Sequence, residues 1–510
     1  MSRNPRILIV TPEITYLPDG MGNATNHMRA KAGGLADVSA SLVSALFELG
    51  ADVHVALPHY RRMFNVDVGR LINDELRIYK RVLPDSRIHL AQDRIFYYQS
   101  EVYSSSLEKS RKLALVFQRE VINNIIPNVN PDLIHCNDWM TGLIPAMARR
   151  HGIPTLFTVH NIHSQELTLA EIEDAGIDAA EFWQSLFYSR YAGDYESARY
   201  DNPVNLLASA MFGAHFVNTV SPTFLHEVCD GQHSFVPPAV RNEMTQKLIA
   251  GCAAGILNAP DPTFNPETDE LISDRFSVAT HVEGKRQNKL HLQERLGLLQ
   301  NPDAPLFFWP SRLDPAQKGC QLVADILYGL VSHYHDDGLQ VVFVATGPYQ
   351  MWFRGIVNEH GLQDRVAVYD FDEETSHQAY AASDFMLMPS MFEPCGLPQM
   401  VSAMYGSLPV VHDTGGLHDT VSMLDMEQDS GNGFLFETYD SNGLWWAIEQ
   451  AMDFYRQPAD IKAAQIGRII RESAQRFTHA NTAREYITIY ERMLERPLVD
   501  HKPGSVAKAV

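Results

Sequence analysis

The chain has 510 residues, of which 45% are hydrophobic, 10% aromatic and 20% charged, and its formal net charge is −21 at pH 7. That length exceeds what one hydrophobic core supports, so two or three domains are expected. The acidic balance argues against a nucleic-acid-binding protein or a membrane-surface protein, because both need clustered positive charge.

The cysteines and the apolar runs indicate the compartment in which the protein works. Five cysteines are scattered along the chain without C-x-x-C spacing, which argues against a disulfide framework and a zinc site. The apolar run at residues 6–10 is too short for a signal peptide, and no later run approaches a membrane span. We therefore expect a cytoplasmic protein with no membrane partner.

The first half of the chain alternates short apolar runs with helical patterns. Leu35, Leu42 and Leu46 follow helical spacing, and Gly50 stands where a C-cap glycine belongs. A second helical pattern covers residues 141–152. Buried parallel strands are predicted at 6–10, 52–58, 132–136, 154–160 and 215–221. This order predicts a doubly wound α/β sheet.

A second α/β cycle begins near residue 305, after the proline-rich stretch 258–267, which we interpret as the joint between two domains. The pattern at 319–334 predicts a helix, and residues 482–496 form an amphipathic helix before a frayed tail at 501–510. Strands are predicted at 304–312, 339–346, 366–371, 385–390 and 408–413. Ligands of such sheets bind at the carboxyl ends of the strands, so two Rossmann-like halves are expected to face one interdomain cleft.

The sequence G-G-L-x-D occurs once in each half, at 33–37 and 415–419. Paired glycines let the backbone approach a ligand, and the helix that follows offers free N–H groups. Lys31 adds a cation suited to phosphate at the first copy. The alternative is a glycine turn that lets the helix pack on its strand. Neither copy matches a G-x-G-x-x-G or Walker A pattern.

Two further loops after predicted strands carry charged residues. Arg312 and Lys318 lie in S-R-L-D-P-A-Q-K-G, where they could neutralise a leaving diphosphate or form a solvated loop. Glu393 lies in M-F-E-P-C-G-L, where it could bind sugar hydroxyls or stabilise a cationic sugar carbon. Cys395 could be a thiol nucleophile, but no base accompanies it, so a small buried residue is the preferred interpretation.

Histidines and acidic residues in the remaining loops give weak metal signals. His160 and His163 have H-x-x-H spacing without a third ligand, and His160 is predicted to line the cleft as a hydrogen-bonding residue. The D-F-D at 370–372 lies in an acidic stretch that a solvated loop explains. The basic pair, the glycine loops and the strand-end glutamate together indicate transfer from a phosphorylated sugar donor.

These motifs, in order, resemble bacterial glycogen synthases and plant starch synthases. The sequences that carry the resemblance, between about residues 6 and 494, are K-A-G-G-L-A-D-V, H-C-N-D-W, T-V-H-N, T-V-S-P-T, G-I-L-N, S-R-L-x-x-x-Q-K-G, E-P-C-G-L and T-G-G-L-x-D-T-V. The resemblance implies a GT-B fold. Its N-terminal, acceptor-side domain would cover 1–262, with the helix at about 480–498 returning to it, and its nucleotide-sugar-binding domain would cover 263–479.

The resemblance also implies an activity. Members of the family transfer glucose, with retention, from ADP-glucose to the non-reducing end of an α-1,4-glucan and need no metal or other cofactor. An alternative is a GT-B glucosyltransferase that uses ADP-glucose or UDP-glucose with a small or non-glucan acceptor. A non-catalytic glucan- or nucleotide-binding paralogue is disfavoured, because the motif residues are all present. The sequence gives no prediction of oligomeric state.

The resemblance assigns roles to individual residues. Arg312 and Lys318 would hold the diphosphate, Glu393 would contact the transferred glucose, and His160 would lie near its anomeric carbon; these four are the predicted catalytic residues. Gly416 and Leu417 would offer backbone N–H groups to the donor phosphates. The predicted substrate-binding residues are Lys31, Gly33, Gly34, Asp37, Asp138, Asn258, Cys395, Gly396, Leu397, Thr414, Gly415, Gly416 and Leu417.

The chain departs from the family pattern mainly in its N-terminal half. The segment from Glu13 to Lys31 is longer than usual, and the residue after Asn258 is not the usual glycine. Position 401 is a valine where bacterial members usually have a tyrosine. Most of these changes lie on the expected acceptor side, so they leave the identity of the acceptor open.

Overall fold

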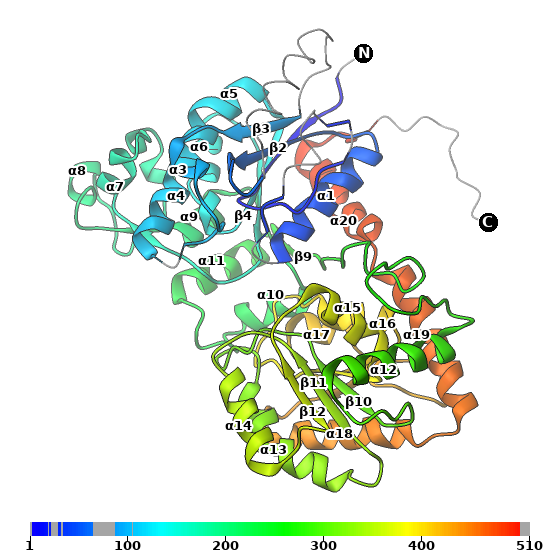
Figure 1. Cartoon of the computed structure of the whole chain (residues 1–510). Coiled ribbons are helices and arrows are strands. Elements are labelled where there is room, and N and C mark those ends of the chain that lie inside the picture. Colours follow the sequence, from blue (N-terminus) through cyan, green and yellow to red (C-terminus); the bar gives the residue numbers. More distant parts are fainter. Residues whose placement is uncertain are drawn as a thin grey trace. The chain divides into compact units, whose positions relative to one another are not determined.

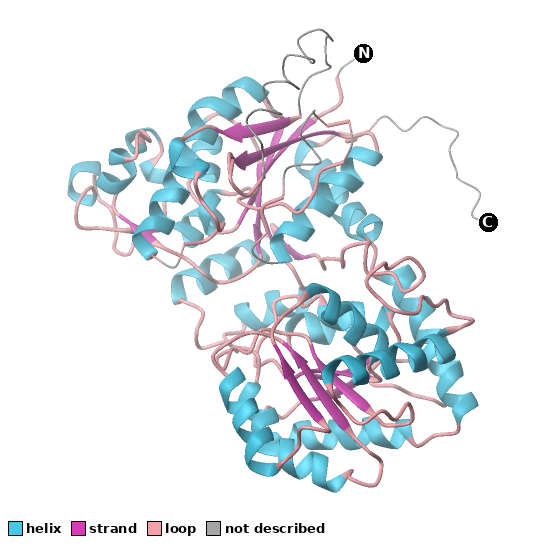
Figure 2. Ribbon diagram, viewed as in Figure 1, coloured by secondary structure: helices cyan, strands magenta, loops and turns pink. Residues whose placement is uncertain are grey.

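The structure is a computed structural model that describes residues 3–18, 20–21, 29–31, 34–64, 87–104 and 106–499. The chain forms two compact units, each a parallel sheet with helices on both faces (Figures 1 and 2). The α/β prediction with two Rossmann-like domains is therefore confirmed. Unit 1 comprises Met1–Val220, Leu225–Ile256 and His479–Val510, and unit 2 comprises Ser221–Phe224 and Leu257–Thr478.

The sheet of unit 1 has seven strands in the order β3-β2-β1-β4-β5-β8-β9, all parallel. The strands are β1 (Arg6–Val10), β2 (Asp52–Pro58), β3 (Ile88–Ala91), β4 (Leu133–Asn137), β5 (Thr155–Val159), β8 (Phe216–Thr219) and β9 (Ala253–Gly255), with a separate antiparallel pair of β6 (Glu166–Leu167) and β7 (Val204–Asn205). The five predicted strands are confirmed. The missed strands β3 and β9 are short and only partly buried, so no apolar run marks them.

Helices cover both faces of this sheet, with α1 and α20 on one side and α4, α6 and α9 on the other (Figure 1). The helices of unit 1 are α1 (Gly34–Glu48), α3 (Arg94–Tyr97), α4 (Leu107–Glu120), η2 (Val121–Ile125), α5 (Ile126–Val129), η3 (Trp139–Thr141), α6 (Ile144–Arg150), α7 (Leu169–Asp174), η4 (Ala179–Glu181), η5 (Trp183–Ser185), α8 (Tyr195–Ala198), α9 (Leu206–Gly213), α11 (Pro238–Ile249) and α20 (His479–Leu494). Helix α10 (Pro222–Cys229) begins within the unit 2 segment Ser221–Phe224 and continues in unit 1.

The first and last helices of unit 1 are held in the fold in different ways, α1 by burial of its apolar face and α20 by hydrogen bonds to strands of the sheet. The apolar face of α1 is buried, including Leu35, Leu42 and Leu46. In α20, the Tyr490 hydroxyl lies 2.7 Å from His135 Nδ1 of β4, and the Tyr486 hydroxyl accepts a 3.1 Å hydrogen bond from Asn218 of β8. These buried bonds satisfy polar groups that would otherwise destabilise the core. The predicted frayed tail 501–510 lies outside the described residues.

Unit 2 has a six-stranded parallel sheet in the order β12-β11-β10-β13-β14-β15, the strand order of a classical dinucleotide-binding fold. Its strands, five of them predicted, are β10 (Leu306–Trp309), β11 (Gln340–Val344), β12 (Val366–Tyr369), β13 (Phe385–Met388), β14 (Leu408–His412) and β15 (Phe434–Phe436). Its helices are α12 (His281–Leu296), α13 (Cys320–His333), α14 (Gln350–His360), α15 (Glu373–Ala382), α16 (Pro398–Met404), α17 (Gly415–Thr420), α18 (Ser441–Tyr455) and α19 (Ala459–Arg476).

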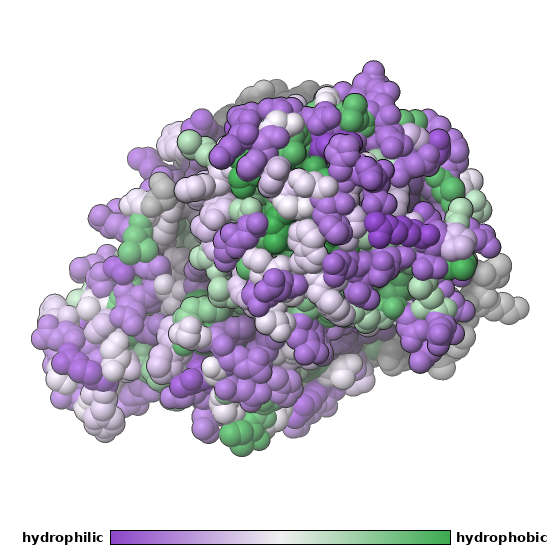
Figure 3. All heavy atoms as spheres, turned by 90° about the horizontal axis from the view of Figure 1, so that it is seen from below, coloured by the Kyte–Doolittle hydropathy of each residue, from purple (hydrophilic) through white to green (hydrophobic). Residues whose placement is uncertain are grey.

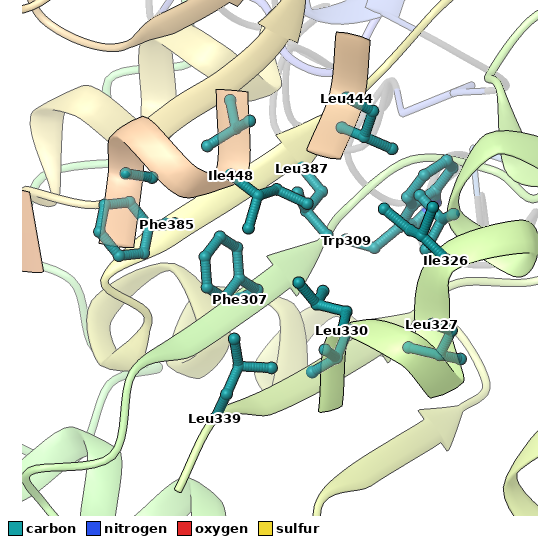
Figure 4. Close-up of a cluster of buried hydrophobic side chains, with 14 of the residues drawn as sticks. Phe307, Trp309, Ile326, Leu327, Leu330, Leu339, Phe385, Leu387, Leu444 and Ile448 are labelled. Carbon is teal, nitrogen blue, oxygen red and sulfur yellow. The ribbon is translucent and has the colours of Figure 1, made fainter. Parts of the chain in front are cut away.

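The central strand β10 divides the core of unit 2 into two halves. Successive side chains of a strand point to opposite faces, so Phe307 and Trp309 pack with α13 and α18, as Figure 4 shows, whereas Leu306 and Phe308 pack on the other face. In Figure 1, α13, α14 and α18 lie on one side of this sheet and α12, α15 and α16 on the other. Burial on both faces explains why these strands have continuous apolar sequences.

Side chains of different hydropathy are mixed on the surface of the protein (Figure 3). Hydrophilic residues predominate on the face drawn in Figure 3, and the hydrophobic residues there occur in small separate groups. Within the described ranges, no helix is long and apolar enough to cross a membrane.

Candidate functional site

The site in unit 2 lies at the carboxyl ends of β10 and β13, the two strands between which the sheet order reverses. Gly319 follows the β10 loop with a φ of +70°, and a Cβ atom there would lie 1.9 Å from the carbonyl oxygen of Pro389 after β13. Only glycine permits this approach of the two loops. The close contact brings Lys318, the residue before Gly319, beside Glu393.

Lys318 and Glu393 form a buried ion pair. Lys318 Nζ lies 2.5 Å from Glu393 Oε2, and the two residues are 9% and 6% exposed. The Ser390 hydroxyl donates to the same carboxylate oxygen at 3.2 Å. Among the described residues, Glu393 Oε1 has no hydrogen-bond partner, and the lysine ammonium has two further N–H donors. The pair therefore keeps an acceptor and two donors for a ligand.

Arg312 lies in the same loop as Lys318 but differs from it in environment. It is exposed, and no hydrogen bond or ion pair of its guanidinium is found within the described part of the chain. A charged group at a strand end with no internal partner is available to a ligand. An exposed forked cation next to a buried one suits a diphosphate, whose oxygens a guanidinium binds in pairs.

The second G-G-L-x-D, at the start of α17, packs against the loop that holds Glu393. A Cβ atom at Gly415 would lie 2.1 Å from the carbonyl oxygen of Glu393, and one at Gly416 would lie 2.0 Å from that of Cys395. Gly416 N–H donates to the Glu393 carbonyl at 2.9 Å, and Leu417 N–H donates to the carbonyl of Thr414 at 3.0 Å. Both N–H groups thus have partners in the protein, and phosphate contacts by them require that these bonds be replaced.

The aspartates of the two G-G-L-x-D sequences bind different partners. Asp419 accepts hydrogen bonds from the Ser221 hydroxyl, the Thr223 N–H and the Thr223 hydroxyl at 2.5, 3.1 and 2.7 Å. It therefore holds the start of α10. Asp37 instead lies 2.9 Å from Lys31 Nζ and accepts from the Thr15 hydroxyl at 2.6 Å.

Two further predicted residues of the first copy can be placed only in part. Gly34 is the first residue of α1. Gly33 lies outside the described residues.

The predicted residues around Cys395 lie in one turn of unit 2. Burial raises the pKa of the Cys395 thiol to about 12, although a backbone hydrogen bond from Asn258 lowers it. A thiol with that pKa is not a thiolate nucleophile at neutral pH, which agrees with the interpretation as a small buried residue. Gly396 and Leu397 lead from this turn into α16. Asn258 is 6% exposed, and its Oδ1 has no partner among the described residues.

In unit 1, Asp138 and His160 lie together at the carboxyl ends of β4 and β5. The Asp138 carboxylate accepts from His160 N–H at 2.8 Å and from Asn161 Nδ2 at 2.9 Å. Asp138 itself has a φ of +56°, which is rare for a residue other than glycine. Burial raises the pKa of Asp138 to about 7 against these hydrogen bonds, and the nearby Glu13 raises it further.

The tautomer of His160 follows from its neighbours. Asn137 Nδ2 donates to the Val10 carbonyl at 3.2 Å, which turns Asn137 Oδ1 toward His160 Nε2 at 3.0 Å. Because an amide oxygen only accepts, His160 carries its proton on Nε2 and presents Nδ1 as an acceptor. Burial lowers the pKa of His160 to about 3, so the ring is neutral at neutral pH.

The structure adds residues that the sequence interpretation did not include in the site. Glu13, buried directly after β1, accepts a 3.1 Å hydrogen bond from the Tyr103 hydroxyl. His412 at the end of β14 donates through Nδ1 to the Ser390 carbonyl at 2.8 Å. The position of Glu13 after a predicted strand is a signal that could have been used. Nothing in the sequence connects Tyr103 or His412 to the other site residues.

The residues that gave weak metal signals contact neighbouring protein groups. Asp370 is 2.8 Å from Arg354 Nη2, and Asp372 caps α15. His163 is exposed, and its N–H donates to Asn161 Oδ1. No group of three or more potential metal ligands is found in the described ranges of the chain.

Comparison with known proteins identifies the family. Residues 6–236 match the starch synthase catalytic domain, and residues 294–468 match glycosyl transferases group 1. A solved structure of the catalytic domain of starch synthase IV from Arabidopsis thaliana, bound to ADP and acarbose, superposes with a TM-score of 0.76 at 25% identity, covering 97% of this chain and 100% of that one.

Two bacterial proteins give the same result over nearly the whole chain. The glycogen synthase of Exiguobacterium sibiricum is 33% identical over 491 residues, which cover 90% of this chain and 95% of that protein. The glycogen synthase of Cellvibrio japonicus is 33% identical over 493 residues, which cover 91% and 96%. The resemblance seen in the sequence motifs is confirmed: the chain belongs to the glycogen synthase and starch synthase family of glycosyltransferases.

Proposed function

We propose that this protein is a glycogen or starch synthase that transfers glucose from ADP-glucose to the non-reducing end of an α-1,4-glucan, with retention at the anomeric carbon. Family membership supports the reaction class. The observation that carries the proposal is the buried Lys318–Glu393 pair, with the exposed Arg312 in the same loop as Lys318, at the point where nucleotide ligands bind in such sheets.

The unit 2 residues have distinct proposed roles. Arg312 and the two remaining N–H groups of Lys318 neutralise the diphosphate, and this neutralisation is the largest contribution of the protein to the rate. Glu393 is fixed through Oε2 by Lys318 and Ser390, so its Oε1 can accept a hydrogen bond from a hydroxyl of the transferred glucose. Asn258 Oδ1, buried without a partner in the described chain, is a second acceptor for the donor.

The unit 1 residues are assigned to the sugar. His160 is neutral and presents Nδ1, so it can accept from a sugar hydroxyl without adding a charge near the anomeric carbon. Asp138 positions the His160 backbone, and Lys31, oriented by Asp37, offers a cation to the donor.

The proposed reaction is a displacement on the front face of the sugar. The bond between the anomeric carbon and the β-phosphate oxygen breaks, and the bond to O4 of the acceptor forms on the same face. The proton of the acceptor hydroxyl goes to the departing phosphate oxygen, which leaves as ADP. Charge neutralisation is assigned to Arg312 and Lys318, so the reaction needs no cofactor.

The donor base and the compartment are part of the proposal. ADP-glucose is preferred to UDP-glucose because the related starch synthase IV catalytic domain is described as bound to ADP. A cytoplasmic location fits the five cysteines, all of which are free thiols.

An acceptor panel tests the proposed function. Purified protein is incubated with radiolabelled ADP-glucose or UDP-glucose and, separately, glycogen, maltotriose and free glucose. Incorporation into glycogen with ADP-glucose, released by α-glucosidase digestion, is the expected result. Transfer only to a small sugar would support the alternative glucosyltransferase. Binding of ADP-glucose with neither transfer nor hydrolysis would overturn the proposal in favour of a binding protein. Lys318→Ala serves as the inactive control.

A further inference from the structure

A cavity in unit 2 lies outside the proposed donor site. Its volume is about 670 Å³, and it is lined from the ends of β14 and β15, from the end of α17 and the segment after it, and from the start of α18. We call it the α18 pocket; the lining residues that the argument uses are Asp413, His418, Met423, Glu437, Thr438 and Trp446. None of the residues proposed to bind the donor lines it.

A layer of side chains separates the α18 pocket from Glu393. His412 Nδ1 donates to the carbonyl of Ser390, and the hydroxyl of Ser390 donates to the Glu393 carboxylate. The His412 ring packs on the rings of Phe436 and Tyr439, with centroid distances of 5.4 and 4.9 Å. The strand order also separates the two sites, because β14 and β15 lie on the side of β13 that is away from β10 and β11. The pocket is therefore a separate candidate site.

The charges of the α18 pocket exclude a phosphorylated ligand. Of its eleven lining residues, Asp413 and Glu437 are carboxylates, His418 is the one histidine, and none is lysine or arginine. His418 Nδ1 lies 2.7 Å from Asp413 Oδ1, so the imidazole is already directed to a carboxylate. An anion would meet these carboxylates without a cation to offset them. A neutral ligand with many hydroxyl groups would instead donate to them.

The remaining lining gives an apolar platform beside these acceptors. Trp446 is 45% exposed, and Met423 is 39% exposed. An indole face buries much area at low entropic cost and suits the flat C–H face of a pyranose ring. Thr438 adds a hydroxyl to the lining. A pocket of this volume, lined by both apolar and polar side chains, is typical of small-molecule sites.

We propose that the α18 pocket binds an α-glucan chain, as a second glucan site beside the site of glucosyl transfer. The inference rests on the proposed function for the identity of the sugar. A chain held in this pocket raises the effective concentration of other chain ends of the same polymer at the enzyme. The site therefore promotes transfer to long or branched glucans and contributes nothing to short acceptors that cannot span two sites.

Hydrogen exchange with maltoheptaose tests the binding directly. With wild-type protein, maltoheptaose slows exchange in the segment 434–446, and Trp446→Ala or Glu437→Gln removes that protection. Tyr328→Ala, which removes an exposed aromatic from α13 of the same unit, retains it. Absence of protection in the wild type, or equal protection in all variants, would refute the glucan site. Protection by ADP and not by maltoheptaose would refute it in favour of a nucleotide site.

A kinetic measurement gives the functional consequence. The ratio of kcat/KM for glycogen to kcat/KM for maltotriose is expected to fall about tenfold in Trp446→Ala and to stay constant in Tyr328→Ala. A constant ratio in Trp446→Ala would overturn the proposed contribution to long acceptors. If the wild-type protein does not glucosylate glycogen at all, the proposed function fails, while the exchange experiment still decides whether the pocket binds glucan.

Discussion

The carboxyl ends of the two sheets carry different chemistry on the same scaffold. In unit 2 the strand-end loops hold full charges, with Lys318 and Glu393 paired in the interior and Arg312 exposed. In unit 1 the corresponding edge holds His160, neutral because burial lowers its pKa to about 3, and Asp138, whose pKa burial raises to about 7. The strand ends of unit 2 keep their charges, whereas burial suppresses charge at the ends of β4 and β5 in unit 1.

This difference matches the two parts of a nucleotide-sugar donor. A diphosphate is anionic and is stabilised by fixed cations, most of all as negative charge develops on the leaving group. A glucosyl group is neutral, and its hydroxyls need oriented donors and acceptors that add no net charge. The comparison therefore predicts that charge removal will be far more damaging at the ends of β10 and β13 than at the ends of β4 and β5.

Lys318→Ala has the largest expected effect. It removes a cation that we propose binds the diphosphate, and it should lower kcat/KM for ADP-glucose by about 10³-fold, similar to the loss of a charge-stabilising donor in other active sites. It also leaves the Glu393 carboxylate buried without its cation, which should lower the free energy of unfolding by about 3–5 kcal/mol. Steady-state kinetics and urea denaturation measure the two effects separately.

A double variant separates chemistry from folding. Lys318→Met with Glu393→Gln removes both charges of the buried pair, so most of the lost stability should return. Activity should stay as low as in the single variant. Recovery of activity together with stability would show that Lys318 acts only in folding. It would contradict the proposed role of fixed charge at the strand ends of unit 2.

Arg312→Ala should lower activity without affecting stability. Its guanidinium is exposed and has no partner in the described chain, so the free energy of unfolding should change by no more than about 0.5 kcal/mol. The rate should fall about 10²-fold, with Arg312→Lys between the two because a lysine lacks the paired donors. A wild-type rate in Arg312→Ala would remove this residue from the site.

The sequence predicted the sheets well because their strands are buried on both faces. Runs such as D-V-H-V-A-L-P became β2 with the predicted bounds, since a continuous apolar run in this context has one stable solution. The strand β9, A-A-G, was missed because neither its composition nor its length distinguishes it from a loop. Its place is set by parallel pairing with β8, which local sequence does not encode.

The sequence suggested residues for the candidate site but could not show which of them contact one another. Strand-end position alone identified Lys318 and Glu393, whereas their pairing depends on Gly319 lying against Pro389 across the two loops. The glycines of the second G-G-L-x-D are explained by close packing on the Glu393 loop, the alternative that the sequence left open beside ligand binding. Tyr103 approaches Glu13 from 90 residues away, a relation that only the tertiary fold creates.

Asp138→Asn tests the suppression of charge in unit 1 through pH dependence. The pKa of Asp138 is raised from 3.8 to about 7 on folding, so the folded state binds a proton that the unfolded state releases between these values. The contribution of Asp138 to the free energy of unfolding of the wild type is therefore largest below about pH 4. It falls by about 4 kcal/mol in total as pH rises from about 4 through 7. The amide side chain of the variant does not ionise, so this part of the pH dependence should disappear.

Urea denaturation of both proteins between pH 5 and pH 9 measures this difference. The unfolding free energy of the wild type should decrease more steeply with pH than that of the variant. A hydrogen bond to Asn161 that the variant loses would change the level of its curve and not this difference in slope. Parallel curves would mean that Asp138 titrates normally and that the ends of β4 and β5 carry a negative charge at neutral pH.

At the amino end of the unit 1 sheet, Asp52 has a lowered pKa, opposite in direction to the pKa shift of Asp138, and its substitution has the smallest expected effect on stability. Asp52, at the start of β2, is partly buried, which raises its pKa, but hydrogen bonds from His54 and Arg6 outweigh burial and lower it from 3.8 to about 2. That shift corresponds to about 2 kcal/mol, which solvent at this carboxylate reduces to about 1 kcal/mol. This contribution to stability is present above about pH 4 and is lost as pH falls toward 2.

Asp52→Asn should therefore be less stable than the wild type at pH 7 by about 1 kcal/mol, and this difference in stability should narrow between pH 4 and pH 2. A difference that widens on acidification would mean that burial, as at Asp138, decides the charge of Asp52 as well.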